Sequence, residues 1–494
     1  MRSKRTLIAL LTPLALLLAY TPLFAQTEAP AQDSRETWMG VYLGDQKIGY
    51  IKMAVSRAKY KGQDALQMDD VVHTKMKMLG TEMQQDVTTV MYTDLTMKPL
   101  FEDFRMSSGG SSTRVEATFL PDVIKCKLIS QETSVDKDVP IPPGVSLMSD
   151  STIYGTGGRK LVVGDTFTFN YFNPLSLSID AANMEVVRQE KVTLKDKTYD
   201  TYVVKSATPM GEITTWQEES GDVVKMAGLM GMLMVRESME EALSEEHDYR
   251  PPSDFAVLTS VKADADLPKS GRINYLKLGL SGFSDKKLAI SDGRQKVTWS
   301  SKDGKPVAGY VISAKKIDGK VSALLPFSSS DLRPYLAEAP YIQSNDPAIK
   351  ELARSIVGKE KRSYQAAGKI RKWVHDHMQM RADMGIVRSA VDVMKNRAGV
   401  CRDYAIFYTA LARAAGIPTR VTAGLVFFDG SFYYHAWAES YTGEWTPFDA
   451  TLATDFVDAT HIKLTQGDAT SMFEIARVIG GLKAQILDYK YVER

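Results

Sequence analysis

Residues 396–418, NRAGVCRDYAIFYTALARAAGIP, carry the strongest structural signal in this chain. After Cys401 apolar residues recur at helical spacing as far as Ala415, and Gly416 and Pro418 are typical of a helix end. The pattern places Cys401 at the N-terminus of a helix, where backbone N–H groups and the helix dipole favour thiolate over thiol. A nearby N–H group could also donate to an oxyanion. On its own, this position is modest evidence for a reactive thiol, because a cysteine among apolar residues is more often an inert core residue.

Two strand-like segments follow this helix. The first, GSFYYHAWAESY at residues 430–441, carries His435, and the second, EWTPFDATLA at residues 444–453, carries Asp449. A Thr-Gly turn joins them, and residues that face each other across such a turn can touch. We therefore expect His435 and Asp449 to be hydrogen-bond partners on a sheet against which the cysteine helix packs. Charge logic then makes the histidine a base for the thiol and the aspartate the group that orients the imidazole.

Each of these residues also has a purely structural interpretation. A lone strand histidine is usually structural or exposed, and Asp449 could merely cap a turn. The three contexts in this order are harder to explain that way. The segments GVCRDYA, ALARAAGIPTRVTAGL, YHAWAESY and WTPFDAT resemble the core of the transglutaminase-like superfamily, over residues from about 346 to about 460.

The resemblance implies a fold and a set of roles. It implies an α+β fold in which a papain-like domain, residues 341–460, packs a helix-borne cysteine on an antiparallel sheet. Carried over residue by residue, Cys401 is the nucleophile, His435 the base and Asp449 the orienting acid. Asp403 matches a family residue after the cysteine and is interpreted as support for the helix start. The β-rich region before the domain resembles the N-terminal extensions of exported bacterial members.

The residues and the resemblance together predict a thiol-dependent enzyme that attacks amide or peptide carbonyls through a thioester. Hydrolysis, as in a protease or amidase, and crosslinking to an amine both remain open, and analogy with bacterial members favours hydrolysis. The expected substrate is a protein or peptide. The alternative from another class is a non-catalytic binding or assembly module at the cell envelope. A third hypothesis, a copper-handling protein, rests on the methionine cluster at residues 226–239, for which packing is the simpler interpretation.

The N-terminus predicts export. Basic residues at positions 2, 4 and 5 precede an apolar stretch at residues 7–18, and Ala25 is a suitable last residue before cleavage. We predict a signal peptide at residues 1–25, with a retained membrane anchor as the alternative. Residues 26–36 are polar and predict a flexible leader. No later segment offers about 20 consecutive apolar residues, so we expect a periplasmic or secreted protein without a stable membrane span after cleavage.

The rest of the chain is predicted to be β-rich on both sides of a linker. Residues 37–244 show alternating apolar and polar positions and hairpin turns, with a proline-rich break at residues 138–145 that suggests a subdivision. Residues 245–254 read as the linker, and residues 255–340 again predict short strands in a middle domain. The C-terminal extension, residues 461–494, receives no role. The N-terminal region could recruit an envelope partner.

Composition excludes several other classes. The chain has 494 residues, 44% hydrophobic and 24% charged, with 61 basic and 60 acidic side chains and a net charge of +1. There is no basic field for nucleic acid. Two cysteines cannot form a disulfide scaffold or a four-cysteine zinc site. A disulfide between Cys126 and Cys401 would disable the nucleophile, and the two lie in different predicted domains.

The remaining histidines predict no metal site. His375 and His377 are two apart on a predicted helix and point to different faces. His73, His247 and His461 are isolated in the sequence. No paired metal motif, phosphate loop or dinucleotide fingerprint occurs, and no cofactor is expected.

Overall fold

The computed structural model describes two compact units, residues 34–254 and residues from 255 onward. It describes residues 34–492 except 79, 132, 150–159, 229–230, 245–253, 268–270, 284, 315–316, 318–321 and 382–384. The predicted signal peptide and most of the predicted leader lie outside the described residues. Residues 34–36, which we assigned to the leader, instead begin the first strand. Within the described part of the chain, no helix combines the length and the apolar character needed to cross a membrane.

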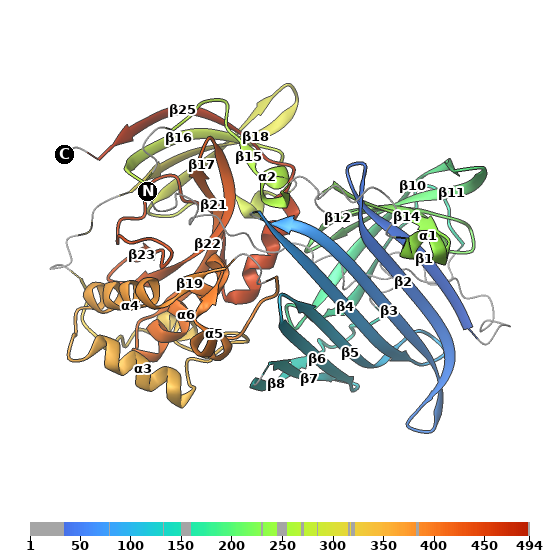
Figure 1. Cartoon of the computed structure of the whole chain (residues 1–494), viewed down its shortest axis with the longest axis horizontal. Helices are drawn as coiled ribbons and strands as arrows, with labels where there is room; N and C mark the ends of the chain where they lie inside the picture. The colour runs from blue at the N-terminus through green and yellow to red at the C-terminus, as the bar shows by residue number, and fades with distance from the viewer. Residues whose placement is uncertain are drawn as a thin grey trace. The chain divides into compact units, whose positions relative to one another are not determined.

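The first unit is built on one antiparallel sheet of 14 strands, in the order β8-β7-β6-β5-β4-β3-β2-β1-β14-β13-β12-β11-β10-β9 (Figure 1). Its strands are β1 (Ser34–Leu43), β2 (Gln46–Tyr60), β3 (Gln63–Met78), β4 (Thr81–Thr93), β5 (Pro99–Ser108), β6 (Ser111–Phe119), β7 (Val123–Ser130), β8 (Thr133–Pro140), β9 (Thr166–Asn173), β10 (Ser178–Leu194), β11 (Lys197–Thr208), β12 (Gly211–Gln217), β13 (Val223–Ala227) and β14 (Met232–Glu237). A short helix, α1 (Met239–Leu243), follows.

Alternation along these strands explains the sheet. In β4 every second residue from Met83 to Thr93 is buried, which is the period of two that a strand with one covered face requires. Meander connections place sequence neighbours side by side, and the predicted hairpins at Gly44, Lys195 and residues 218–222 all form. Gly44 adopts a positive φ of 60°, a conformation that glycine reaches without a Cβ clash. The proline-rich break at residues 138–145 covers the end of β8 and the start of the connection to β9, and these are the two edge strands of this one sheet.

The methionine cluster at residues 226–239 also belongs to this sheet. Met226 and Met234 are paired across β13 and β14, and both are buried, as is Met232. These positions agree with the packing interpretation of the cluster.

The described residues of the second unit form five α-helices, among them the one predicted from Cys401 and the one predicted around His375 and His377. They are α2 (Phe255–Thr259), α3 (Pro347–Val357), α4 (Ser363–His377), α5 (Ala390–Asn396) and α6 (Cys401–Ala414). Local sequence explains α3, because the Asp346 carboxylate accepts the N–H groups of Ala348 and Ile349, and Gly358 ends the helix. Gly416, with φ of 80°, lies just after α6, as predicted.

The second unit also contains two larger antiparallel sheets and a parallel pair of short strands, β19 (Gln379–Met380) and β20 (Ala398–Gly399). The first has the order β15-β22-β21-β24, with β23 paired to β22, and α6 packs against it. The second has the order β17-β18-β16-β25. Their strands are β15 (Val261–Lys262), β16 (Ile273–Ser281), β17 (Gln295–Lys302), β18 (Lys305–Ser313), β21 (Thr419–Phe428), β22 (Ser431–Tyr441), β23 (Trp445–Phe448), β24 (Ile462–Gly467) and β25 (Lys483–Tyr491).

The chain crosses between these two sheets more than once. Strand β15 precedes helices α3 to α6 in sequence but pairs with β22. The C-terminal extension contributes β24 to the sheet of β21 and β22, and then β25 to the sheet of β16. Sequence segments that read as a middle domain, a catalytic domain and an extension are therefore interleaved in one unit. This α+β unit holds all three predicted site residues.

Candidate active site

Cys401 is the first residue of α6 and is fully buried. Val400 precedes it as the N-cap, and the Val400 N–H group donates to Asp403 Oδ2 at 2.8 Å. Asp403 therefore supports the helix start, as the sequence indicated, and the Arg388 guanidinium lies 3.4 Å from its other oxygen. Helix α6 is buried along its length, from Cys401 to Arg413. The cysteine is thus held rigidly where the unpaired N–H groups of a helix begin.

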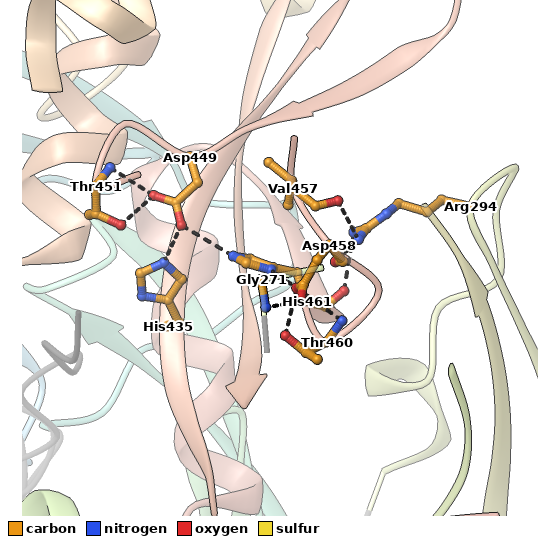
Figure 2. Close-up of polar contacts among 9 residues, drawn as sticks. All are labelled: Gly271, Arg294, His435, Asp449, Thr451, Val457, Asp458, Thr460 and His461. Carbon is orange, nitrogen blue, oxygen red and sulfur yellow. Dashed lines mark hydrogen bonds and ion pairs between the residues drawn. The ribbon is translucent and has the colours of Figure 1, made fainter. Parts of the chain in front are cut away.

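His435 and Asp449 meet beside the sheet. His435 lies in β22, and Asp449 directly follows β23, which pairs with β22. The imidazole Nε2–H group donates to Asp449 Oδ2 at 2.7 Å, and each side chain is only 1% exposed (Figure 2). The predicted contact across the turn is present. Trp437, two residues along β22, stacks on the His435 ring, with 6.1 Å between centroids.

The second oxygen of Asp449 is also fixed. Asp449 Oδ1 accepts the Thr451 backbone N–H at 2.8 Å and the Thr451 hydroxyl at 2.6 Å. A carboxylate that accepts this many hydrogen bonds cannot turn without losing one. The side chain therefore presents Oδ2 to His435 in one orientation.

Electrostatics favour a charged pair despite the burial. Burial alone lowers the pKa of His435, but the charges of Asp449 and Cys401 outweigh it and raise that pKa to about 10. Burial acts against the Asp449 carboxylate too, yet the charge and hydrogen bond of His435 hold its pKa far below the usual range. Cys401 interacts with the same imidazole. Since Nε2 is engaged by Asp449, Nδ1 is the ring nitrogen left for the thiol.

The structure also brings in a residue that the sequence analysis set aside. His461, expected to be isolated, lies with its Nε2 atom 3.2 Å from Asp449 Oδ2, and it is 2% exposed. The expectation fails because the 11 intervening residues are mostly irregular and fold back on themselves, so no strand or helix period links the two positions. The only local signal was DATH at residues 458–461, an aspartate three residues before the histidine.

His435, Asp449 and His461 also offer one ligand atom each within 4.8 Å, a set that could hold a metal ion. Imidazole nitrogens and a carboxylate oxygen are a zinc-type donor set. The Nε2–Oδ2 separations of 2.7 and 3.2 Å are those of direct hydrogen bonds. A metal between these atoms would have to replace both bridging protons.

The two cysteines are in different units, and neither forms a disulfide. Cys126 lies in β7. Burial, and to a lesser extent the charge of Glu102, raises the pKa of its thiol to about 12. The thiol that interacts with a histidine is Cys401.

Residues 350–450 match the model of the transglutaminase-like superfamily. These residues form a transglutaminase-like domain. The match begins within α3 and ends just after Asp449, so the three predicted site residues all fall inside it. The resemblance predicted from the motifs is confirmed, and the domain indicates a thiol-dependent enzyme.

Other parts of the chain have weaker relatives. Residues 40–227, ahead of the transglutaminase-like domain, match the family described as "Protein of unknown function (DUF3108)". No curated protein matches the chain. A crystal structure from Cytophaga hutchinsonii, of a proposed cysteine protease, is 22% identical over 44% of this chain and 86% of its own, with a TM-score of 0.32.

Two further solved structures are similar to this chain at lower identity. A β-barrel-like protein with a domain of unknown function (DUF1849) from Brucella abortus is 13% identical over 41% of this chain and 94% of its own, with a TM-score of 0.30. A proposed protease from Parabacteroides distasonis is 12% identical over 69% of this chain and 64% of its own, with a TM-score of 0.20.

Proposed function

We propose that the protein is a thiol-dependent acyl-transfer enzyme that acts on amide or peptide carbonyls of a protein or peptide. One observation carries the proposal: within a transglutaminase-like domain, the buried His435–Asp449 hydrogen bond of 2.7 Å orients an imidazole that also interacts with Cys401. Nucleophile, base and orienting acid are the three parts that this chemistry requires.

The reaction divides into two balanced steps. The Cys401 thiolate attacks the carbonyl carbon, the C–N bond breaks, and the His435 imidazolium gives its proton to the leaving amine. A thioester on Cys401 remains. His435 then takes a proton from water, the resulting hydroxide attacks the thioester, and the C–S bond breaks to release a carboxylic acid and the thiolate. Asp449 holds the imidazole throughout and stabilises its charged form.

Hydrolysis is the favoured outcome, on the analogy of bacterial members of the superfamily. An amine in place of water would give a crosslink by the same thioester. The choice depends on whether water or an amine reaches the thioester first. A peptidase and an acyltransferase therefore share the three residues and differ in the acceptor.

Burial of the site favours a second candidate function. Cys401 is 0% exposed, and His435 and Asp449 are 1% exposed, so a substrate needs the site to open. A non-catalytic binding or assembly module at the cell envelope has no such need. In that hypothesis the first unit recruits the partner, and the transglutaminase-like domain serves as a scaffold.

We also propose that the protein works outside the cytoplasm, in the periplasm or after secretion, since the N-terminal residues have the layout of a signal peptide. Fractionation of the producing cells, with the protein detected in the periplasm or medium or in the cytoplasm, tests this placement. Loss of residues 1–25 from the recovered chain, read by mass spectrometry, tests cleavage. A chain that keeps these residues supports the retained anchor instead.

The enzymatic test uses residues 26–494 with a peptide mixture, in the presence and absence of a labelled primary amine. We expect a covalent acyl adduct on Cys401 and new carboxyl ends, both absent from Cys401→Ala. Predominant amine incorporation would make the protein a crosslinking enzyme. If Cys401→Ala forms the same products, or if it fully supports the cellular role of the wild type, the scaffold hypothesis replaces the enzymatic one.

A further inference from the structure

Asp449 accepts hydrogen bonds from two imidazoles at the same oxygen. His435 Nε2 is 2.7 Å and His461 Nε2 is 3.2 Å from Asp449 Oδ2 (Figure 2). The two rings are 5.7 Å apart and inclined at 72°, so they approach the carboxylate from different directions. The His435–Asp449 pair alone would leave this oxygen with one donor; His461 supplies a second.

His461 is itself held at its other nitrogen. Its Nδ1 atom is 3.1 Å from Asp458 Oδ1. A carboxylate oxygen can only accept, so both contacts are satisfied when both ring nitrogens carry a proton. The ring is buried, with the Trp437 ring set perpendicular to it at 5.3 Å. Asp449 and Asp458 contact the ring nitrogens, His435 lies beyond the first carboxylate, and the Arg294 guanidinium contacts the His461 backbone carbonyl.

Asp458 is held in turn by a neighbouring threonine and by groups from a distant part of the chain. The Gly271 backbone N–H group donates to Asp458 Oδ2 at 2.7 Å. The Thr460 hydroxyl donates to Asp458 Oδ1 at 2.6 Å. The Arg294 guanidinium binds the backbone carbonyls of Val457, Asp458 and His461, the last at 3.1 Å. The residues before β16 and β17 therefore fix the loop that carries His461.

We propose that His461 is a positioning residue of the active site: its Nε2–H group holds Asp449 as a second donor, and thereby fixes the His435 ring for Cys401. His461 touches neither the thiol nor a reacting carbonyl in this role. The inference rests on the proposed function, because a primed thiol is what the positioning serves. The competing explanation is that His461 only anchors its loop through Asp458.

Two substitutions separate these explanations. The side-chain nitrogen of glutamine lies near the place of imidazole Nε2, and that of asparagine near the place of Nδ1. His461→Gln can therefore keep the bond to Asp449 and lose the bond to Asp458, while His461→Asn does the reverse. Thr460→Val is the matched control, since it removes a hydrogen bond from Asp458, keeps the side-chain shape and leaves Asp449 untouched.

The measurement is the rate at which iodoacetamide alkylates Cys401 in the whole protein, read on its own peptide by mass spectrometry. We expect His461→Asn to react about tenfold or more slowly than wild type, the loss that one hydrogen bond to a charged group implies. His461→Gln and Thr460→Val should stay within about threefold of wild type. Rescue by glutamine but not by asparagine is a ranking that loop anchoring does not produce.

The opposite ranking, or equal loss in both variants, would overturn the positioning role and leave His461 as a loop anchor. Thermal unfolding checks whether His461→Asn folds. If it does not fold, the alkylation rates of His461→Gln and Thr460→Val are compared instead. A His461→Gln variant that reacts more slowly than Thr460→Val refutes the proposal. His435→Ala tests the function on which it rests. If wild-type Cys401 reacts no faster than in His435→Ala, the primed thiol is absent and the proposed function fails; if it reacts faster, only the His461 ranking is at stake.

Discussion

Both units of this protein contain a cysteine and a hydrogen-bonded histidine–aspartate pair, but only the second unit brings them together. In the first unit His73 Nδ1 lies 2.6 Å from Asp86, on neighbouring strands β3 and β4. Cys126 lies in β7, which is separated from β4 in the sheet by β6 and β5. Buried and more exposed residues alternate along β3 and β7. Cys126 is on the buried face of β7, whereas His73 is on the more exposed face of β3. The same residue types therefore give no site there.

The comparison shows what the second unit adds. Its cysteine begins a helix instead of lying within a strand. The first backbone N–H groups of that helix have no partner within the helix and lie near the thiol. Its His435–Asp449 pair is 1% exposed, whereas the side chains of His73 and Asp86 are 20% and 42% exposed. Charge interactions are strong where water is excluded and weak where it is not. Placement and burial, rather than composition, distinguish the two regions.

The largest expected difference between the regions comes from neutralising the aspartate in each pair. Asp449→Asn should lower the rate of thioester formation by about 10³- to 10⁴-fold, because an amide no longer supports the imidazolium or selects its tautomer. Asp86→Asn is the matched control and should leave the rate unchanged. Acyl-adduct formation on Cys401, followed by mass spectrometry, measures both. Similar rates in the two variants would mean that the buried pair has no catalytic role.

The next largest effect concerns the stability of two charge clusters. Glu439, in β22, is buried and accepts from Arg420 at 2.7 Å and from Lys463 at 2.9 Å. Glu439→Gln removes the carboxylate that pairs with the buried Arg420 and leaves Lys463 paired with Asp292, and it should cost about 3 kcal/mol of unfolding free energy. In the first unit Asp103 pairs with Arg105 and Arg114, both partly exposed. Asp103→Asn should cost only about 1 kcal/mol, because water screens its partners.

Urea unfolding with pulse proteolysis and peptide mapping reads the stability of each unit separately. Equal losses of unfolding free energy from Glu439→Gln and Asp103→Asn would contradict the distinction between a charge cluster with buried partners and one with solvent-exposed partners. A loss that spreads to the other unit would show that the two units unfold together.

The smallest expected effect is a difference in pH dependence. The pKa of His435 is raised in the folded state, so its contribution to stability is complete below about pH 6.5 and is lost as pH rises through the folded value. Cys126 also has a raised pKa, but its contribution begins to fall only above about pH 8.5. The second unit should therefore lose stability first on moving from about pH 7 to about pH 8.5.

The same urea assay at several pH values measures this order. His435→Gln should remove the fall in the second unit's unfolding free energy between about pH 7 and about pH 8.5. Cys126→Ala should remove the fall that the first unit shows above about pH 8.5. An unchanged fall in His435→Gln would assign it to another group. At the acid end the sign reverses, because the lowered pKa of Asp449 gives stability that is lost as pH falls below its unfolded value near 4.

Local patterns predicted much of the second unit. The helix from Cys401 and the glycine after it depend on residues within a few positions of each other. The contact between His435 and Asp449 depends on one tight turn. In the first unit, alternation predicted strands but not their number or partners, because a period of two fixes which face is buried and not which edge pairs.

By itself, the sequence predicted that Cys401 begins a helix and that His435 and Asp449 face each other, since both depend on short-range geometry, and its motifs resembled those of a transglutaminase-like domain. Only the tertiary structure decided that His461 reaches Asp449, that Gly271 and Arg294 fasten its loop, and that β15, β24 and β25 cross between sheets. These contacts join residues separated by irregular chain or by more than 150 positions. No backbone period operates over such separations, so burial and hydrogen-bond satisfaction in the folded protein select them.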